Sequence, residues 1–235
     1  METVKVTGPI VPNSSKWIYD WLEIEATAPQ DLEKAFEKAG GEDVTIWINS
    51  GGGDVGAGNE MAYIIGSYKG KTIADIAGYC CSAATLVSCA ADKARMMPSA
   101  LYMIHNVSSY AEGDHQVFGH EANVLKAASE AIAEAYHRKT GKSIKELAKL
   151  MDNETWLNAR QAKEEGFIDE IIENKNNMSL INGIEPMLSE ETIEKIRSQI
   201  KLTVIPTEDK EAFLNAKKQA KAKLELLKMK GEMNV

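Results

Sequence analysis

Residues 71–92, KTIADIAGYCCSAATLVSCAAD, decide the fold class, because a strand pattern passes directly into a helix pattern. KTIADIAG (71–78) has the pattern of a short strand, and YCCSAATLVSCAAD (79–92) is a run of small and apolar residues that predicts a buried helix. Ser82 stands where the pattern turns helical. A Ser in that place most often caps the helix, but a nucleophile at the head of a buried helix would occupy the same position.

The alternation of strands and helices continues on both sides of this stretch. It predicts β-α units and a largely parallel sheet, which is an α/β fold. The other expected strands are VKVTGPIV (4–11), DVTIWINS (43–50), two fragments about Pro98 and Ser99, and FIDEII (167–172). The other expected helices cover residues 28–41, 59–70, 117–139, 143–153 and 159–166.

The composition narrows the class of protein. The 235 residues are 44% hydrophobic and 26% charged, which is ordinary for a globular chain. The net charge of −8 argues against general nucleic-acid binding, and no run approaches the roughly 20 apolar residues of a membrane span. The N-terminus lacks a signal-peptide pattern, and Cys80, Cys81 and Cys89 have neither metal-ligand nor disulfide-framework spacing. We therefore expect a cytoplasmic protein with no cofactor, metal, nucleic acid or membrane as partner.

The balance of charged residues changes near the C-terminus of the chain. Seven Lys stand against two Glu between positions 210 and 230, although the chain as a whole is acidic. We therefore expect a main domain over residues 1–174, a linker over 175–188 and a helical extension over 189–235. This extension can pack on its own domain or bind a partner. Its apolar positions repeat at coiled-coil-like spacing, namely Phe213, Ala216, Ala220, Leu224 and Leu227.

Strand ends carry residue types suited to acyl transfer. DVTIWINS is followed by Gly51, Gly52 and Gly53, whose backbone N–H groups can point at a ligand oxygen, although a plain tight turn is the commoner outcome. No Gly-Lys-Ser/Thr follows, which disfavours a phosphate loop. His105 closes LYMIHN and is either a core histidine or a general base. For the other three His we expect a solvated surface position.

A carboxylate completes this set of residue types. A nucleophilic Ser needs a base within hydrogen-bond reach, and the base needs a carboxylate that fixes its tautomer. The stretch MDNETW supplies Asp152 and Glu154, so that Ser, His and acid follow one another in that order. Each member alone is weak evidence, but the ensemble is much harder to dismiss.

These motifs resemble the ClpP-type serine peptidases, and among them most closely the ClpP-related head maturation proteases of tailed phages and prophages. The resemblance runs from Val4 to Ile172 and rests on INSGGGDVGAG, GYCCSAAT, MIHN and ETWLNARQAKEEGFID. It implies a ClpP/crotonase-like fold of repeated β-β-α units with a protruding handle helix, followed by a helical C-terminal extension. VTGPI begins within the first few residues, so we expect the family's axial docking segment to be missing.

The resemblance also implies roles for individual residues. Ser82 matches the nucleophile and His105 the general base. When WLNA is aligned with the corresponding family motif, Glu154 matches the position of the acid, which is usually an Asp. Asp152 is the alternative acid. The two oxyanion-binding N–H groups fall on Gly53 and Ala83, where a side chain at Gly53 is expected to crowd the substrate carbonyl.

For the whole protein, the resemblance implies a serine endopeptidase that cleaves polypeptides through an acyl-enzyme and forms a ring-shaped homo-oligomer. It implies capsid or scaffold protein as partner, in the bacterial host cytoplasm or the prohead. Four alternatives stay open: an unfoldase-fed Clp protease subunit, a crotonase-like acyl-CoA enzyme, a Ser/Lys peptidase and an inactive scaffold. In the family, the segment corresponding to 107–141 stacks rings; here simple packing on the parent domain is equally compatible with its apolar positions, Val117, Val124, Leu125, Ala128, Ile132 and Ala135.

Overall fold

The computed structural model describes residues 2–172 and residue 218. One seven-stranded sheet forms the centre of the first unit, Met1–Glu173. Its strands are β1 (Glu2–Ile10), β2 (Val44–Gly53), β3 (Thr72–Cys81), β4 (Lys93–Met96), β5 (Leu101–Ile104), β6 (Thr155–Asn158) and β7 (Glu170–Ile171). The helices are α1 (Asn13–Leu22), α2 (Pro29–Ala39), α3 (Val55–Gly66), α4 (Ala83–Ala90), α5 (His115–Thr140), α6 (Ile144–Asp152) and α7 (Ala159–Glu164).

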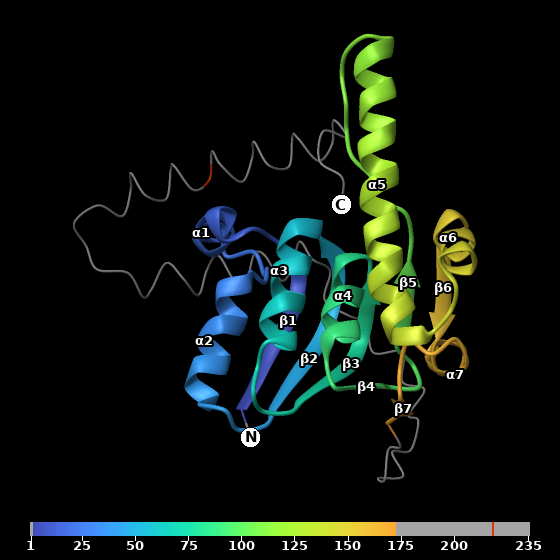
Figure 1. The fold of residues 1–235 in the computed structure, drawn as a ribbon. Coiled ribbons are helices and arrows are strands. Elements are labelled where there is room, and N and C mark those ends of the chain that lie inside the picture. Colours follow the sequence, from blue (N-terminus) through green and yellow to red (C-terminus); the bar gives the residue numbers. More distant parts are fainter. Residues whose placement is uncertain (1, 173–217, 219–235) are drawn as a thin grey trace, which may run out of the picture. The chain divides into compact units, whose positions relative to one another are not determined.

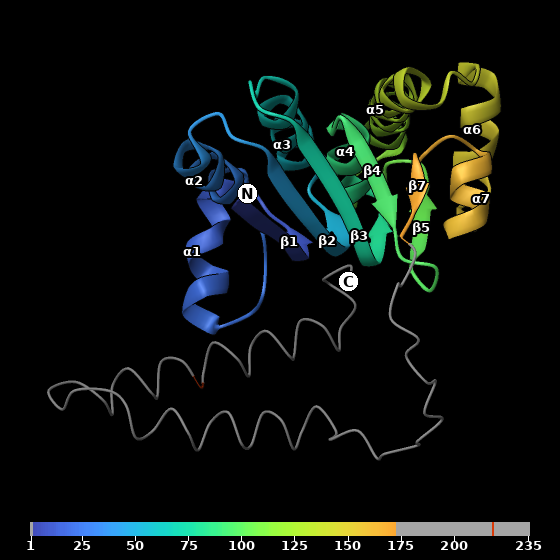
Figure 2. The same ribbon diagram turned by 90° about the horizontal axis from the view of Figure 1, so that it is seen from below.

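The sheet is parallel except at one pair of strands. The order β1-β2-β3-β4-β7 is parallel throughout, β5 also pairs parallel with β3, and β6 runs antiparallel to β5. Helices α2, α3, α4 and α5 lie on one face of the sheet (Figure 2). The α/β architecture predicted from the sequence is therefore confirmed.

On the edge opposite β2, strand β3 pairs with two different strands along its length, and this arrangement creates the site. Its residues 73–76 pair with β4, whereas Tyr79–Cys81 pair with β5. Cys81 lies opposite Met103 in this register. Strands β3 and β5 are parallel and end at the same edge of the sheet. Ser82, which follows β3, and His105, which follows β5, therefore lie side by side.

Helix α4 packs against the sheet directly behind this edge. Ala83, Ala84, Leu86 and Val87 are all buried, as the small apolar run predicted. The side chains are small enough for α4 to lie close to α3, where the Cβ of Ala83 approaches Gly58. A buried helix in this place holds its first turn rigidly beside Ser82.

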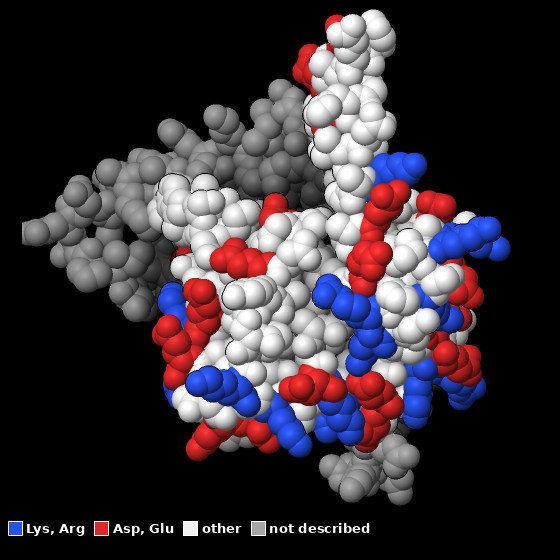
Figure 3. All heavy atoms as spheres, in the orientation of Figure 1, with Lys and Arg blue, Asp and Glu red and all other residues white. Residues whose placement is uncertain are grey.

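Helix α5 packs into the core of the domain with its C-terminal half only. Ile132, Ala133 and Tyr136 are its buried residues, and the N-terminal half projects beyond the sheet (Figure 1). Val117, Phe118 and Val124 are exposed on the projecting part. On the visible face, that part carries little charge, while Lys, Arg, Asp and Glu are mixed over the body of the domain (Figure 3).

Several expected boundaries differ from the observed ones. Residues 79–81 continue β3 instead of starting the helix, and α3 begins at Val55, directly after the glycine turn, because the Asp54 side chain accepts a hydrogen bond from Ala57 N–H. Helix α1 and strand β6 were not expected. The linker 175–188 and the extension 189–235 lie outside the described residues, apart from Lys218. In the described part of the chain, no helix is long and apolar enough to span a bilayer.

Candidate active site

Ser82 occupies a sharp turn between β3 and α4. Its backbone has φ 53° and ψ −128°, a conformation that residues other than glycine rarely adopt. The Ser82 N–H donates to the Met103 carbonyl (2.9 Å), and the Ser82 carbonyl accepts from Thr85 N–H (2.9 Å). The side chain makes no capping hydrogen bond, although Ser82 holds the N-cap position of α4. Its hydroxyl is therefore directed away from the helix it precedes, and the capping interpretation is wrong.

His105 follows β5 and faces Ser82. Its Nε2 lies 2.8 Å from Ser82 Oγ, and both residues are half-buried. In the tautomer with the proton on Nδ1, Nε2 accepts the hydrogen bond from the hydroxyl, which is the arrangement a general base needs. The other three histidines, His115, His120 and His137, are exposed. Their expected surface position is confirmed.

The two candidate acids are hydrogen-bonded to residues other than His105. Glu154 Oε1 accepts from Trp156 Nε1 (3.2 Å), and Asp152 Oδ1 accepts from the amide of Asn106 (2.8 Å). Among the described residues, neither carboxylate is hydrogen-bonded to His105. Glu154 has φ 46°, so its backbone is also in the left-handed region. The arrangement thus contains a Ser-His pair, with two acids in the adjoining loop.

The three glycines, which were expected to form a turn after the strand, are instead the last residues of β2 and form the opposite wall. Ser50 Oγ donates to the Gly8 carbonyl (2.6 Å) and accepts from Gly52 N–H (3.1 Å). Of the three glycines, Gly53 lines the cleft together with Ser82 and His105. A Cβ on Gly53 would come 2.2 Å from the Ile10 carbonyl oxygen. The neighbouring strand β1 therefore requires a glycine there, and crowding of a substrate carbonyl is not needed to explain it.

Gly52 is the residue that sequence reasoning missed. It has φ 96°, and a Cβ on it would contact Ser82 Cβ at 2.7 Å. Three consecutive glycines were the only available signal, and they do not tell which one adjoins the nucleophile position.

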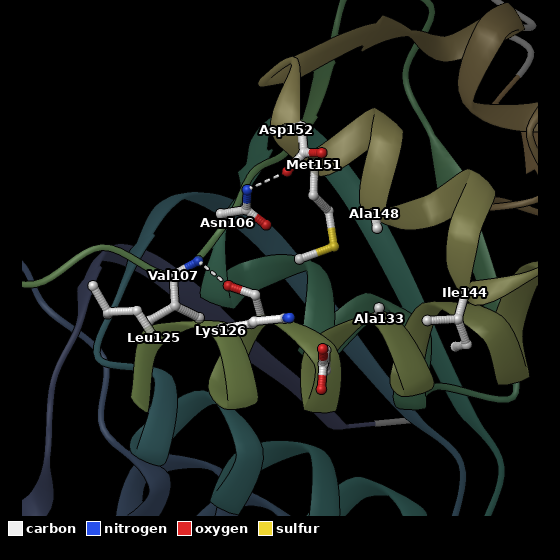
Figure 4. A pocket seen from close by; sticks show the side chains of 11 residues that line it. Asn106, Val107, Leu125, Lys126, Ala133, Ile144, Ala148, Met151 and Asp152 are labelled. Carbon is white, nitrogen blue, oxygen red and sulfur yellow. Dashed lines mark hydrogen bonds between the residues drawn. The ribbon is translucent and has the colours of Figure 1, made fainter. Parts of the chain in front are cut away.

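The cleft beside Ser82 is small and shares two lining residues, Asn106 and Val107, with a larger cavity. It measures about 60 Å³, with apolar walls from Val55, Val107 and Ile132. A cavity of about 430 Å³ lies between α5 and α6, with Asn106 and Asp152 at its edge (Figure 4). The cleft presents the Ser82 hydroxyl and the His105 imidazole beside apolar side chains, a combination suited to nucleophilic attack on an acyl group. Its other polar lining residues are Asn106, Ser108 and Tyr136.

The cysteines near Ser82 are poor nucleophiles. Burial raises the pKa of Cys81 to about 11, and burial likewise raises the pKa of Cys89 to about 11. Both remain thiols near neutral pH, and the thiolate is the reactive form. Within the described residues, no group of three or more His, Cys, Asp or Glu side chains is arranged to hold a metal ion.

Comparison with known proteins identifies a family for this chain. The family model for Clp protease matches residues 32–175. The ATP-dependent Clp protease proteolytic subunit of Streptococcus sanguinis is 27% identical over 178 residues, covering 74% of this chain and 85% of the relative. The subunit of the same name from Streptococcus pyogenes is 28% identical over 181 residues, covering 73% and 84%.

The solved structures include a matching fold. A ClpP1 mutant from Listeria monocytogenes is similar with a TM-score of 0.61 and 27% identity, covering 74% of this chain and 92% of that one. The fold is therefore a ClpP-like α/β fold, with the sheet and the projecting helix that the sequence resemblance implied.

Proposed function

The chain belongs to the Clp protease family, and from this premise we propose that it is an endopeptidase with Ser82 as nucleophile and His105 as general base. The observation that carries the proposal is the 2.8 Å distance between Ser82 Oγ and His105 Nε2, at the edge of a cleft walled by Gly53. A serine hydroxyl is a weak nucleophile unless such a base removes its proton.

In the proposed reaction, Ser82 Oγ attacks a peptide carbonyl carbon while its proton passes to His105 Nε2. The backbone N–H groups of Gly53 and Ala83 stabilise the oxyanion, and His105 then protonates the departing amine. In the second half of the reaction, His105 takes a proton from water, which attacks the acyl-enzyme carbonyl carbon. His105 then returns a proton to Ser82 Oγ as the acyl group leaves. Ala83 is the first residue of α4, so the positive end of the helix dipole would support the developing negative charge.

Glu154 is the proposed third member, with Asp152 as the alternative. Either carboxylate must exchange its present partner for His105 Nδ1: Glu154 must leave the Trp156 indole, or Asp152 must leave Asn106. Both residues are exposed, so a side-chain rotation costs little packing. The alignment of ETWLNA with the family pattern favours Glu154.

A serine-directed fluorophosphonate probe tests the chemistry directly. We expect it to modify Ser82, as located by mass spectrometry, and to abolish hydrolysis of a fluorogenic peptide. Ser82→Ala should remove both labelling and hydrolysis without lowering the thermal unfolding temperature. Hydrolysis that survives in Ser82→Ala would disprove the assignment of the nucleophile. Absence of labelling and hydrolysis in the wild-type protein would favour an inactive scaffold, whereas acyl-CoA turnover without peptide hydrolysis would favour a crotonase-like enzyme.

The proposed biological role is maturation of capsid or scaffold protein in a phage prohead, within the bacterial host cytoplasm. Its support is the resemblance of the motifs to phage head maturation proteases, together with the Lys-rich segment near the C-terminus. Co-expression with the neighbouring capsid gene should give shortened capsid protein with the wild-type enzyme and full-length protein with Ser82→Ala. Deletion of residues 186–235 should reduce recruitment to proheads.

A second candidate role is that of a protease subunit fed by an unfoldase. Its support is that the similar curated proteins are named ATP-dependent Clp protease proteolytic subunits. The two roles make opposite predictions. An unfoldase-fed subunit degrades a folded substrate only with a partner ATPase and ATP, whereas a self-contained maturation protease cleaves its capsid substrate without either.

A further inference from the structure

A buried pair of hydrogen bonds holds the backbone of Ser82. The Ser82 carbonyl accepts from two groups of the same residue, Thr85 N–H at 2.9 Å and Thr85 Oγ1 at 2.5 Å. Because φ of Ser82 lies in the left-handed region, its conformation persists only where surrounding contacts enforce it. Thr85 is one of those contacts, although it does not touch the reacting atoms.

The Thr85 hydroxyl is in turn bonded to Tyr136. The oxygens Thr85 Oγ1 and Tyr136 Oη lie 2.6 Å apart, and both side chains are fully buried. A threonine hydroxyl has a single proton, and the Ser82 carbonyl can only accept, so that proton points to Ser82. Tyr136 must therefore donate to Thr85. Burial raises the pKa of Tyr136 above its ordinary value, which keeps this donor protonated.

Helix α5 is thereby connected to both halves of the Ser-His pair. Tyr136 reaches the Ser82 turn through Thr85. Seven residues earlier on α5, Ser129 Oγ accepts from Val107 N–H at 3.0 Å, two residues beyond His105 (Figure 4). Residues seven apart lie on the same face of a helix. A single helix face thus contacts the segments that carry Ser82 and His105.

We infer that Tyr136 is a positioning residue for Ser82: its hydroxyl donates to Thr85 Oγ1, and this hydroxyl fixes the Ser82 carbonyl so that Ser82 Oγ stays directed at His105 Nε2. The inference rests on the proposed function, since it assigns a role within the same reaction. Hydrogen bonds in such a buried chain polarise and strengthen one another, so loss of the first donor weakens the contact to Ser82.

The domain offers a matched control in Tyr102. This tyrosine is also fully buried, and its hydroxyl also contacts a hydroxyl of α4, Ser88 Oγ at 3.0 Å. Its further contacts are Cys89 Sγ and the backbone carbonyl of Thr85, and none of these groups bonds to Ser82. Tyr102→Phe therefore removes the same chemical group from the same core and leaves in place the Thr85 hydroxyl and N–H, the two groups that hold the Ser82 carbonyl.

The test compares Tyr136→Phe, Tyr102→Phe, Thr85→Val and Thr85→Ser. We expect Tyr136→Phe to lower kcat for a fluorogenic peptide and the rate of fluorophosphonate labelling by about 3- to 10-fold, the equivalent of one hydrogen bond, with KM nearly unchanged. Thr85→Val should lower both rates at least as much, Thr85→Ser should restore them, and adding Tyr136→Phe to Thr85→Val should cost nothing more. Tyr102→Phe should stay within about twofold of wild type, since its hydroxyl bonds neither to the Thr85 hydroxyl nor to Ser82.

Hydrogen exchange at the Thr85 amide supplies a readout that does not depend on activity, because this N–H donates to the Ser82 carbonyl. Exchange should be faster in Tyr136→Phe than in Tyr102→Phe. Equal rates and equal exchange in the two variants would overturn the inference, as would additive effects in the Tyr136/Thr85 double variant. If the wild-type protein shows neither hydrolysis nor labelling, the proposed function fails, and the exchange comparison alone then supports or overturns the link from Tyr136 to Ser82.

Discussion

Gly52 lies directly against Ser82: a Cβ atom on Gly52 would come 2.7 Å from the Ser82 Cβ and 2.9 Å from Ala83 N. The glycine end of β2 and the turn after β3 are therefore packed backbone to backbone. Ser50 secures this packing from the other side, because its hydroxyl accepts from Gly52 N–H and donates to Gly8. The position of Ser82 depends on the absence of a side chain in the neighbouring strand.

Gly52→Ala should consequently inactivate the enzyme. The added methyl group must displace Ser82 or Ala83, and φ 96° is itself unfavourable for alanine. A displacement of about 1 Å at a reacting group can lower the rate by about 100-fold. The measurement is kcat/KM for a fluorogenic peptide, alongside the thermal unfolding temperature.

Gly51→Ala is the matched control, since a Cβ there meets no atom within 4 Å. It should keep activity within a few-fold of wild type. Equal losses in the two variants would show that the turn needs glycine throughout and that contact with Ser82 is not the reason.

The acid of the proposed triad can be identified by two isosteric substitutions. Glu154→Gln should lower kcat by about 10²- to 10⁴-fold, because an amide cannot stabilise the imidazolium and favours the wrong tautomer. Asp152→Asn should cost less than about tenfold if its partner is only Asn106. The reverse order of effects would assign the role to Asp152.

Trp156→Phe adds a test of the exchange that this assignment requires. It removes the indole N–H that now holds Glu154 Oε1, without changing the carboxylate itself. If Glu154 must turn to His105, the variant should be as active as wild type or more so. A large loss of activity in Trp156→Phe would contradict the proposed rotation.

The location of the site was predictable because its signals are local. Ser82 precedes a small apolar run, His105 ends a strand, and a parallel sheet brings successive strand ends to one edge. The acid was less accessible to sequence reasoning, because its hydrogen-bond partner depends on side-chain rotation in an exposed loop. The antiparallel pairing of β6 with β5 was missed for a related reason, since four residues carry too little periodicity to indicate a strand.

Contacts between buried polar groups could not be predicted from the sequence. Thr85 and Tyr136 are 51 positions apart, and each fits its own helix as an ordinary interior residue. The positive φ of Ser82 likewise could not be predicted from the sequence, because serine rarely adopts it and tertiary contacts impose it here. The close approach of β1 to Gly53, which by itself requires a glycine there, was likewise not indicated by the sequence.

The projecting part of α5 should mediate assembly. Phe118 is 53% exposed there, between the exposed Val117 and Val124, in a stretch with little charge. If ring-shaped oligomers stack through this helix, as proposed from the family resemblance, Phe118→Glu should remove about 2 kcal/mol or more per contact and separate the stacked rings. Sedimentation velocity should then show particles of about half the mass.

Asn123→Glu is the control for this assembly test. It introduces the same charge on the exposed surface of the same helix without removing an apolar side chain. It should leave the sedimentation profile unchanged. A wild-type protein that sediments only as a monomer under active conditions would exclude the ring, and an unchanged profile in Phe118→Glu would exclude this surface.

Asp169 should make the stability of the domain dependent on pH. Its carboxylate joins two elements: Ala94 N–H of β4 donates to Asp169 Oδ2 at 2.7 Å, and Lys139 of α5 donates to the same atom at 2.8 Å. Partial burial alone would raise the pKa of Asp169, but these two hydrogen bonds and the charge of Lys139 lower it overall. The ionised form is therefore the one that the fold prefers.

Because the folded-state pKa lies below the unfolded value of about 3.9, the stabilisation is fully present above about pH 4 and is lost as the pH falls through the folded value. Asp169→Asn should lower the free energy of unfolding at pH 7 by about 1 kcal/mol or less, since the carboxylate is nearly half exposed. The difference from wild type should shrink below pH 4, where the wild-type carboxyl is itself protonated. Urea unfolding at pH 7, 5 and 3 measures it, with the exposed Glu164→Gln as control. A difference that stays constant down to pH 3 would mean that Asp169 acts through packing rather than through its charge.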